Sequence, residues 1–65
     1  MKFSDILKLM YQEYNVDFCY VADHMGIPDE IVQDWEADKS RPTEVEMKKF
    51  SDLFALPMKL LNETK

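Results

Sequence analysis

The chain has 65 residues, of which 46% are hydrophobic, and a formal net charge of −5 at pH 7. This length fits one small domain, residues 1–65, and the lone cysteine, Cys19, excludes an internal disulfide. Residues 17–38 hold seven carboxylates and no Lys or Arg, so this block lacks the basic stripe typical of nucleic-acid binders. A free thiol and the lack of a long apolar run favour a cytoplasmic protein with no membrane span.

Residues 3–14 are expected to form the first helix. Their apolar side chains recur at helical spacing, namely Phe3, Ile6, Leu7, Met10 and Tyr14. Ser4 is a candidate N-cap, and Asn15 can end the helix in a left-handed conformation.

Residues 17–36 contain the start and stop signals of two short helices joined by a turn. Asp17 is a candidate N-cap for a helix over residues 18–25, and Gly26 suits its left-handed C-terminal position. Pro28 fits the first turn of the next helix, whose apolar side chains are Ile31, Val32 and Trp35. We expect Trp35 to lie in the core.

Residues 37–42 read as a loop ended by a proline. A fourth helix is expected from about residue 43 to 54, with its inward side chains at Val45, Met47, Phe50, Leu53 and Phe54. Pro57 opens a short fifth helix that carries Met58, Leu60 and Leu61. No segment alternates like a strand, so the predicted fold is all-α with five helices.

The register of these elements resembles the Cro/CI family of helix-turn-helix domains, the lambda-repressor-like or XRE-type fold. The resemblance covers nearly the whole chain, with the helix-turn-helix unit at about residues 17–36. It rests on the helix-2 pair Val21-Ala22, the turn Gly26-Ile27, the helix-3 residues Val32, Trp35 and Glu36, the loop Lys39-Ser40-Arg41-Pro42, and the apolar positions Met47, Phe50, Phe54, Leu56 and Leu61.

The resemblance implies a set of DNA contacts, because in this family helix 3 enters the major groove and helix 2 lies across the backbone. The implied positions are Phe18 at the start of helix 2, Asp29, Glu30, Gln33 and Asp34 on helix 3, and Lys39, Ser40 and Arg41 in the loop. Double-stranded DNA is therefore the expected partner, with a homodimer through Met58 and Leu60 as a further option.

Several of these positions depart from the family. Phe18 stands where Gln is common, which removes a phosphate donor. Asp29, Glu30 and Asp34 can only accept hydrogen bonds, chiefly from cytosine amino groups, and the phosphates repel them. Each of these residues also has a purely structural interpretation. Asp29 and Glu30 would stabilise the helix N-terminus, Asp34 would be a solvated surface residue, and Phe18 would fold back onto a neighbouring helix.

Two functions remain open. One is a bacterial or phage transcriptional regulator that binds DNA. The other is a protein-interaction module on the same scaffold, such as an antirepressor or DNA mimic, whose acidic helix 3 and Phe18 meet a basic protein.

Glu36 raises a separate question, since the family often pairs it with an Arg that is Tyr11 here. We hypothesise that the Tyr11 hydroxyl, or a backbone N–H, satisfies the Glu36 carboxylate. A neutral donor compensates such a carboxylate less well than Arg does.

Catalytic and metal chemistry is not expected. Cys19 and His24 lack the paired spacing of zinc sites, so we predict neither metal nor cofactor. The chain holds one His and no glycine-rich phosphate loop, and Asp23 and His24 point apart as helix neighbours. We therefore expect no enzymatic activity.

Overall fold

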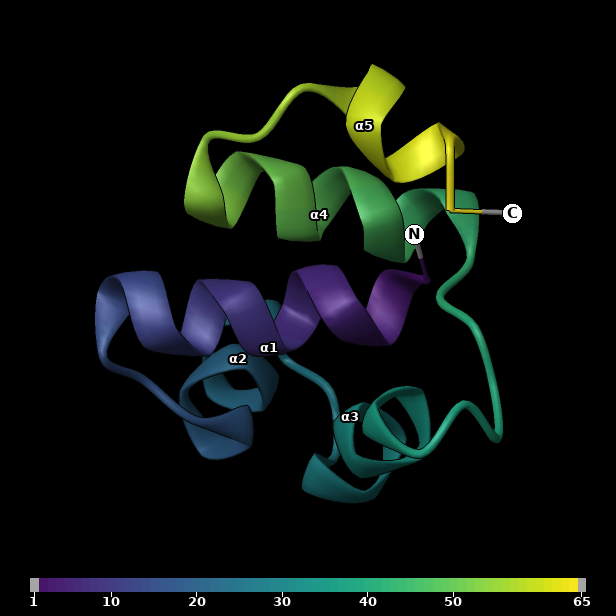
Figure 1. Cartoon of the computed structure of the whole chain (residues 1–65). Helices are drawn as coiled ribbons and strands as arrows, with labels where there is room; N and C mark the ends of the chain where they lie inside the picture. Colours follow the sequence, from purple (N-terminus) through teal and green to yellow (C-terminus); the bar gives the residue numbers. More distant parts are fainter. Residues whose placement is uncertain (1, 65) are drawn as a thin grey trace.

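The computed structural model describes residues 2–64, and all of its regular structure is helical. The helices are α1 (Phe3–Tyr14), α2 (Phe18–Met25), α3 (Asp29–Glu36), α4 (Glu44–Phe54) and α5 (Met58–Asn62). The all-α class and the positions of the helices follow the sequence prediction. In Figure 1, α1 and α4 run side by side in the same direction, with α2 and α3 below them and α5 above.

A hydrophobic core joins the helices. Its members are Phe3, Ile6, Leu7, Met10, Val21, Ala22, Met25, Val32, Trp35, Met47, Phe50, Phe54 and Leu61. Trp35 is 1% exposed, which confirms its predicted place in the core. Its ring meets Phe3 edge to face at a centroid distance of 5.6 Å, and Phe3 in turn contacts Phe50 at 5.1 Å. These aromatic contacts tie α3 to α1 and α1 to α4.

Val45 was predicted to face inward, and that prediction is wrong. Its side chain is 66% exposed in the first turn of α4. Met47, Phe50 and Phe54 already bury one face of this helix. Val45 lies two residues before Met47, about 200° around the helix, and is therefore turned away from that face.

Side-chain caps form at the starts of α2 and α4, the first of them as predicted. Asp17 accepts a hydrogen bond from the Tyr20 backbone N–H at 3.2 Å, and Thr43 accepts one from the N–H of Glu46 at the same distance. Asn15 and Gly26 both adopt the left-handed conformation, with φ of 54° and 71°.

Ser4 does not cap α1, contrary to the prediction. The N-cap is Lys2, whose backbone N–H donates to the Asp5 carboxylate at 3.2 Å, while Ser4 lies inside the helix and is buried. Phe3 packs against Trp35 and Phe50 in the core. Because Phe3 is the first helical residue, α1 begins before Ser4.

Two further residues take left-handed backbone conformations without being glycine or asparagine. Asp38, in the loop after α3, has φ 58°, and Ala55, at the end of α4, has φ 55°. Alanine gains no local hydrogen bond from its side chain there, so Ala55 carries backbone strain.

No helix within residues 2–64 is both long and apolar enough to cross a membrane.

Candidate nucleic-acid interface

The pair formed by α2 and α3 is held by local backbone chemistry. Gly26 ends α2 in the left-handed conformation, and the Ile27 N–H donates to the Ala22 carbonyl at 3.0 Å. Pro28 then stands at the N-cap of α3 in an extended conformation, one position before its first helical residue. Val21, Val32 and Trp35 anchor both helices in the core. The turn over residues 26–28 therefore sets a fixed relation between α2 and α3.

The outward side of α3 is polar and carries the predicted base-reading residues. Asp29, Glu30 and Gln33 are exposed, and Asp34 is half-buried. Spacings of three and four residues place neighbouring members of this set on one face of a helix. The structure thus brings these four residues together on one surface.

The start of α2 meets the start of α3 through a residue that the sequence reading did not place in the site. Cys19 is exposed, and its Sγ lies 3.7 Å from Asp29 Oδ2. Desolvation, the charges of Asp29 and Asp17, and the hydrogen bond to Asp29 raise the pKa of the Cys19 thiol. The thiol therefore stays protonated and serves as a weak donor to Asp29. The only sequence signal for this contact was the position of Cys19 within the first turn of the helix.

Phe18 lies between the two predicted alternatives. Its side chain is half-buried and packs against the core cluster. Part of the side chain therefore contributes to stability, and the rest is exposed to a partner.

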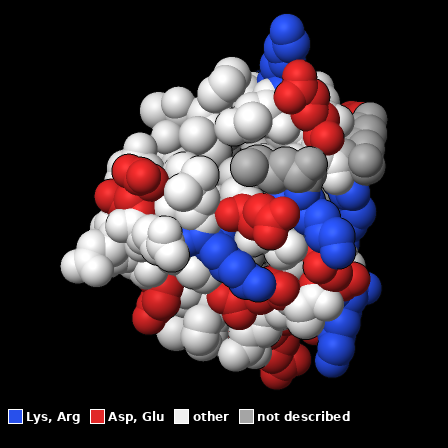
Figure 2. Space-filling model, in the orientation of Figure 1, with Lys and Arg blue, Asp and Glu red and all other residues white. Residues whose placement is uncertain are grey.

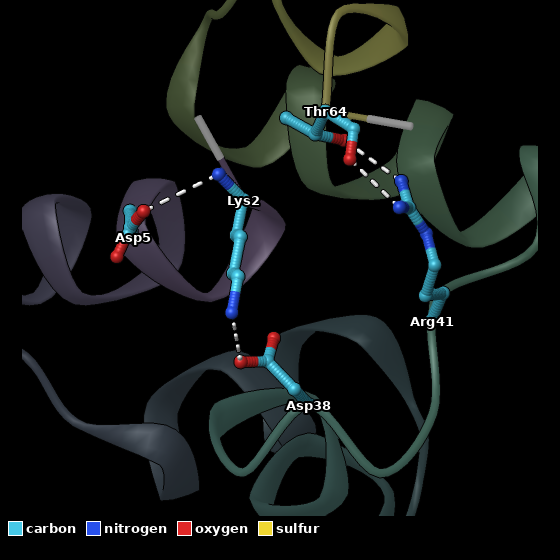
Figure 3. Close-up of polar contacts among 5 residues, drawn as sticks. All are labelled: Lys2, Asp5, Asp38, Arg41 and Thr64. Carbon is cyan, nitrogen blue, oxygen red and sulfur yellow. Dashed lines mark hydrogen bonds and ion pairs between the residues drawn. The ribbon is translucent and has the colours of Figure 1, made fainter.

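The loop after α3 separates its predicted phosphate contacts. Lys39 and Ser40 are exposed. Arg41 reaches the end of the chain, where its Nη1 donates to the Thr64 carbonyl at 2.7 Å and its Nη2 to Thr64 Oγ1 at 3.0 Å (Figure 3). These bonds occupy two of the five N–H donors of the guanidinium. Arg41 therefore links the loop to the C-terminal segment by hydrogen bonds, and fewer of its donors are left for a phosphate.

An ion pair between the start of α1 and the same loop lies near Arg41. Lys2 Nζ is 3.6 Å from Asp38 Oδ2, and both side chains are largely exposed (Figure 3). One cleft of about 430 Å³ lies between these segments. It is lined by Lys2, Asp38, Ser40 and Arg41, and also by Trp35. An exposed ion pair contributes only about 0–1 kcal/mol, and because Asp38 offsets the charge of Lys2, this contact adds little net positive charge near the loop.

The hypothesised Tyr11–Glu36 hydrogen bond falls outside standard hydrogen-bond geometry, although the Glu36 carboxylate lies near enough to act on the hydroxyl. The Tyr11 hydroxyl is buried and has no hydrogen-bond partner among the described residues. Burial first, and then the hydrogen-bonding and charge interactions with the Glu36 carboxylate, raise the pKa of Tyr11 well above its usual range. The two groups are neighbours, and the hydrogen bond between them is at most a weak one.

Charge on the surface follows the uneven sequence distribution. Figure 2 shows basic side chains along the edge where the loop between α3 and α4 runs, and acidic side chains spread over the face. Within residues 2–64, no ion pair involves Asp29, Glu30 or Asp34. The surface of α3 is therefore an uncompensated negative one.

His24 lies apart from the Cys19–Asp29 contact. Its ring stacks on Tyr20 at a centroid distance of 4.0 Å, and Nδ1 lies 2.9 Å from the Tyr20 carbonyl oxygen. Cys19 and His24 thus have separate partners.

Compared with known proteins, the chain matches no family model, no curated protein and no solved structure.

Proposed function

We propose that the protein is a lambda-repressor-like helix-turn-helix domain that binds DNA as a transcriptional regulator. The supporting observation is the fixed α2–turn–α3 pair, whose apolar side is buried while the polar side of α3 faces solvent. A helix that reads base edges needs this division, since its scaffold must be rigid and its reading face free.

In this proposal α3 enters the major groove and α2 lies across the phosphate backbone. Gln33 can make paired hydrogen bonds to adenine, and the carboxylates of Asp29 and Glu30 can accept from the amino group of cytosine. Among residues 2–64, Lys39 forms no ion pair or side-chain hydrogen bond, so we assign this loop cation to a phosphate.

Electrostatics sets the expected affinity. Phosphate neutralisation supplies much of the free energy of binding, and each neutralised phosphate adds about 0.9 to the slope of log K against log salt. With Lys39 free and Arg41 held by Thr64, few phosphates are neutralised. We therefore expect weak binding with a shallow salt dependence.

Fluorescence anisotropy with a labelled mixed-sequence duplex at about 50 mM salt tests this proposal. We expect micromolar binding that Lys39→Ala weakens. The triple variant Asp29→Asn, Glu30→Gln, Asp34→Asn should bind the mixed duplex more tightly and lose preference for cytosine-containing sites. Asp52→Asn, which removes one charge from an exposed position of α4, is the matched control and should change little. No binding at micromolar protein would refute the proposal.

The uncompensated charge of α3 supports a second candidate, a protein-interaction module for a basic protein partner. The same triple variant separates the two, because neutralisation should strengthen DNA binding but weaken binding to a basic protein. A homodimer also remains a prediction. Met58 is half-buried and, with the exposed Val45, lines a groove of about 440 Å³ between α4 and α5.

A further inference from the structure

An apolar surface lies where α1 and α4 end and α2 begins. Four large hydrophobic side chains are exposed in the described chain, and three of them, Leu9, Tyr14 and Tyr20, are here, at 43%, 51% and 37%. Leu9 and Tyr14 line a hollow of about 540 Å³ with Phe54, and Tyr20 borders another of about 460 Å³. We call this region the helix-end surface.

The aromatic side chains of the helix-end surface are held in place. Tyr14 donates its hydroxyl to the Phe54 carbonyl at 3.1 Å, and the two rings lie 5.0 Å apart. Tyr20 lies 6.5 Å from the Phe54 ring and is stacked on His24. Fixed aromatic rings lose little conformational entropy when a partner covers them, which makes them good anchors for a protein interface.

The charge around the helix-end surface is negative. α1 and α4 both end there, on the left of Figure 1, and neither has a basic residue in its last turn. Each helix C-terminus carries a partial negative charge that favours a nearby cation. Glu13 and Asp17 line the hollows, and no Lys or Arg occurs in residues 9–38.

We propose that the helix-end surface binds an amphipathic, basic helix of a partner protein. The apolar stripe of that helix would cover Leu9, Tyr14 and Tyr20, with its Lys and Arg side chains against Glu13, Asp17 and the helix C-termini. This is the helix-in-groove mode of peptide recognition. A second copy of the chain fits less well, because it would place the same acidic groups against each other.

The helix-end surface is separate from the loop that carries Lys39, which Figure 1 places at the opposite end of the molecule. It adjoins the start of α2, which the proposed DNA complex also uses. Leu9→Gln on α1 and Lys39→Ala in the loop therefore test the two interactions separately.

A labelled helical peptide of Leu and Lys, with Leu along one face, is the probe, and fluorescence anisotropy is the measurement. We expect saturable micromolar binding that Leu9→Gln weakens about tenfold through lost apolar contact. Val45→Gln is the matched control, since Val45 is the remaining exposed large hydrophobic residue and lies at the other end of α4. It should leave the affinity unchanged.

Glu13→Lys separates binding from folding. It places a cation in the last turn of α1, which stabilises the helix. It should nevertheless weaken binding of the Leu–Lys peptide at least as much as Leu9→Gln does. A peptide with Glu in place of Lys should not bind. The proposal fails if the Leu–Lys peptide does not bind, if the Glu peptide binds equally, or if neutralising Asp29, Glu30 and Asp34 weakens binding as much as Leu9→Gln.

Discussion

Replacing Tyr11 by Phe isolates the effect of one buried hydroxyl. The Tyr11 oxygen is inaccessible to solvent and has no partner within standard hydrogen-bond geometry among residues 2–64, and an unsatisfied buried polar group costs about 1–3 kcal/mol. Phe keeps the ring and its packing against the core. We therefore expect Tyr11→Phe to raise the free energy of unfolding by roughly 1 kcal/mol near neutral pH, which is about 4–8 °C in Tm for so small a domain.

The pH dependence gives a second readout of the same group. Burial and the Glu36 carboxylate raise the pKa of Tyr11, so the folded state favours the protonated phenol. This contribution to stability is complete below the unfolded pKa of about 10, and it is lost as pH rises toward the folded pKa, at roughly 1.4 kcal/mol per pH unit. Tyr11→Phe removes this loss, so its advantage over the wild type should widen above about pH 10.

Urea unfolding followed by Trp35 fluorescence, at neutral and alkaline pH, measures both effects. Tyr14→Phe is the control, because the Tyr14 hydroxyl does donate, to the Phe54 carbonyl, and its loss should cost about 1 kcal/mol. If Tyr11→Phe destabilises the protein near neutral pH as much as Tyr14→Phe does, the Tyr11 hydroxyl has a partner and the reasoning is wrong.

Two substitutions test the helix ends by thermal unfolding. Ala55→Gly should raise the free energy of unfolding by about 0.5–1 kcal/mol, because glycine adopts the left-handed conformation at φ 55° without strain. The greater entropy of glycine in the unfolded chain offsets part of this gain. A lower Tm would show that Ala55 is not strained. Thr43→Ala should lower the free energy of unfolding by about 1 kcal/mol, since the Glu46 N–H at 3.2 Å loses its acceptor. An unchanged Tm would show that the N-terminus of α4 needs no cap.

Local chemistry made much of the fold predictable. Asp17, Asn15 and Gly26 mark helix ends because their side chains or backbone freedom act within a few residues. Part of the candidate site followed as well, since Asp29, Glu30 and Gln33 share a face through helical spacing alone. Arg41 and Tyr11 were placed less well, because their environments depend on groups 23 and more residues away along the chain.

The sequence by itself determined the all-α class, the helix positions, the burial of Trp35 and the acidic character of α3, because periodicity, capping and charge are local properties. Only the tertiary structure decided that Arg41 is held by Thr64 and that Tyr14 and Tyr20 both lie beside Phe54. Tyr14 and the Phe54 carbonyl are 40 residues apart, and their contact exists only because α1 and α4 pack with their C-terminal ends together.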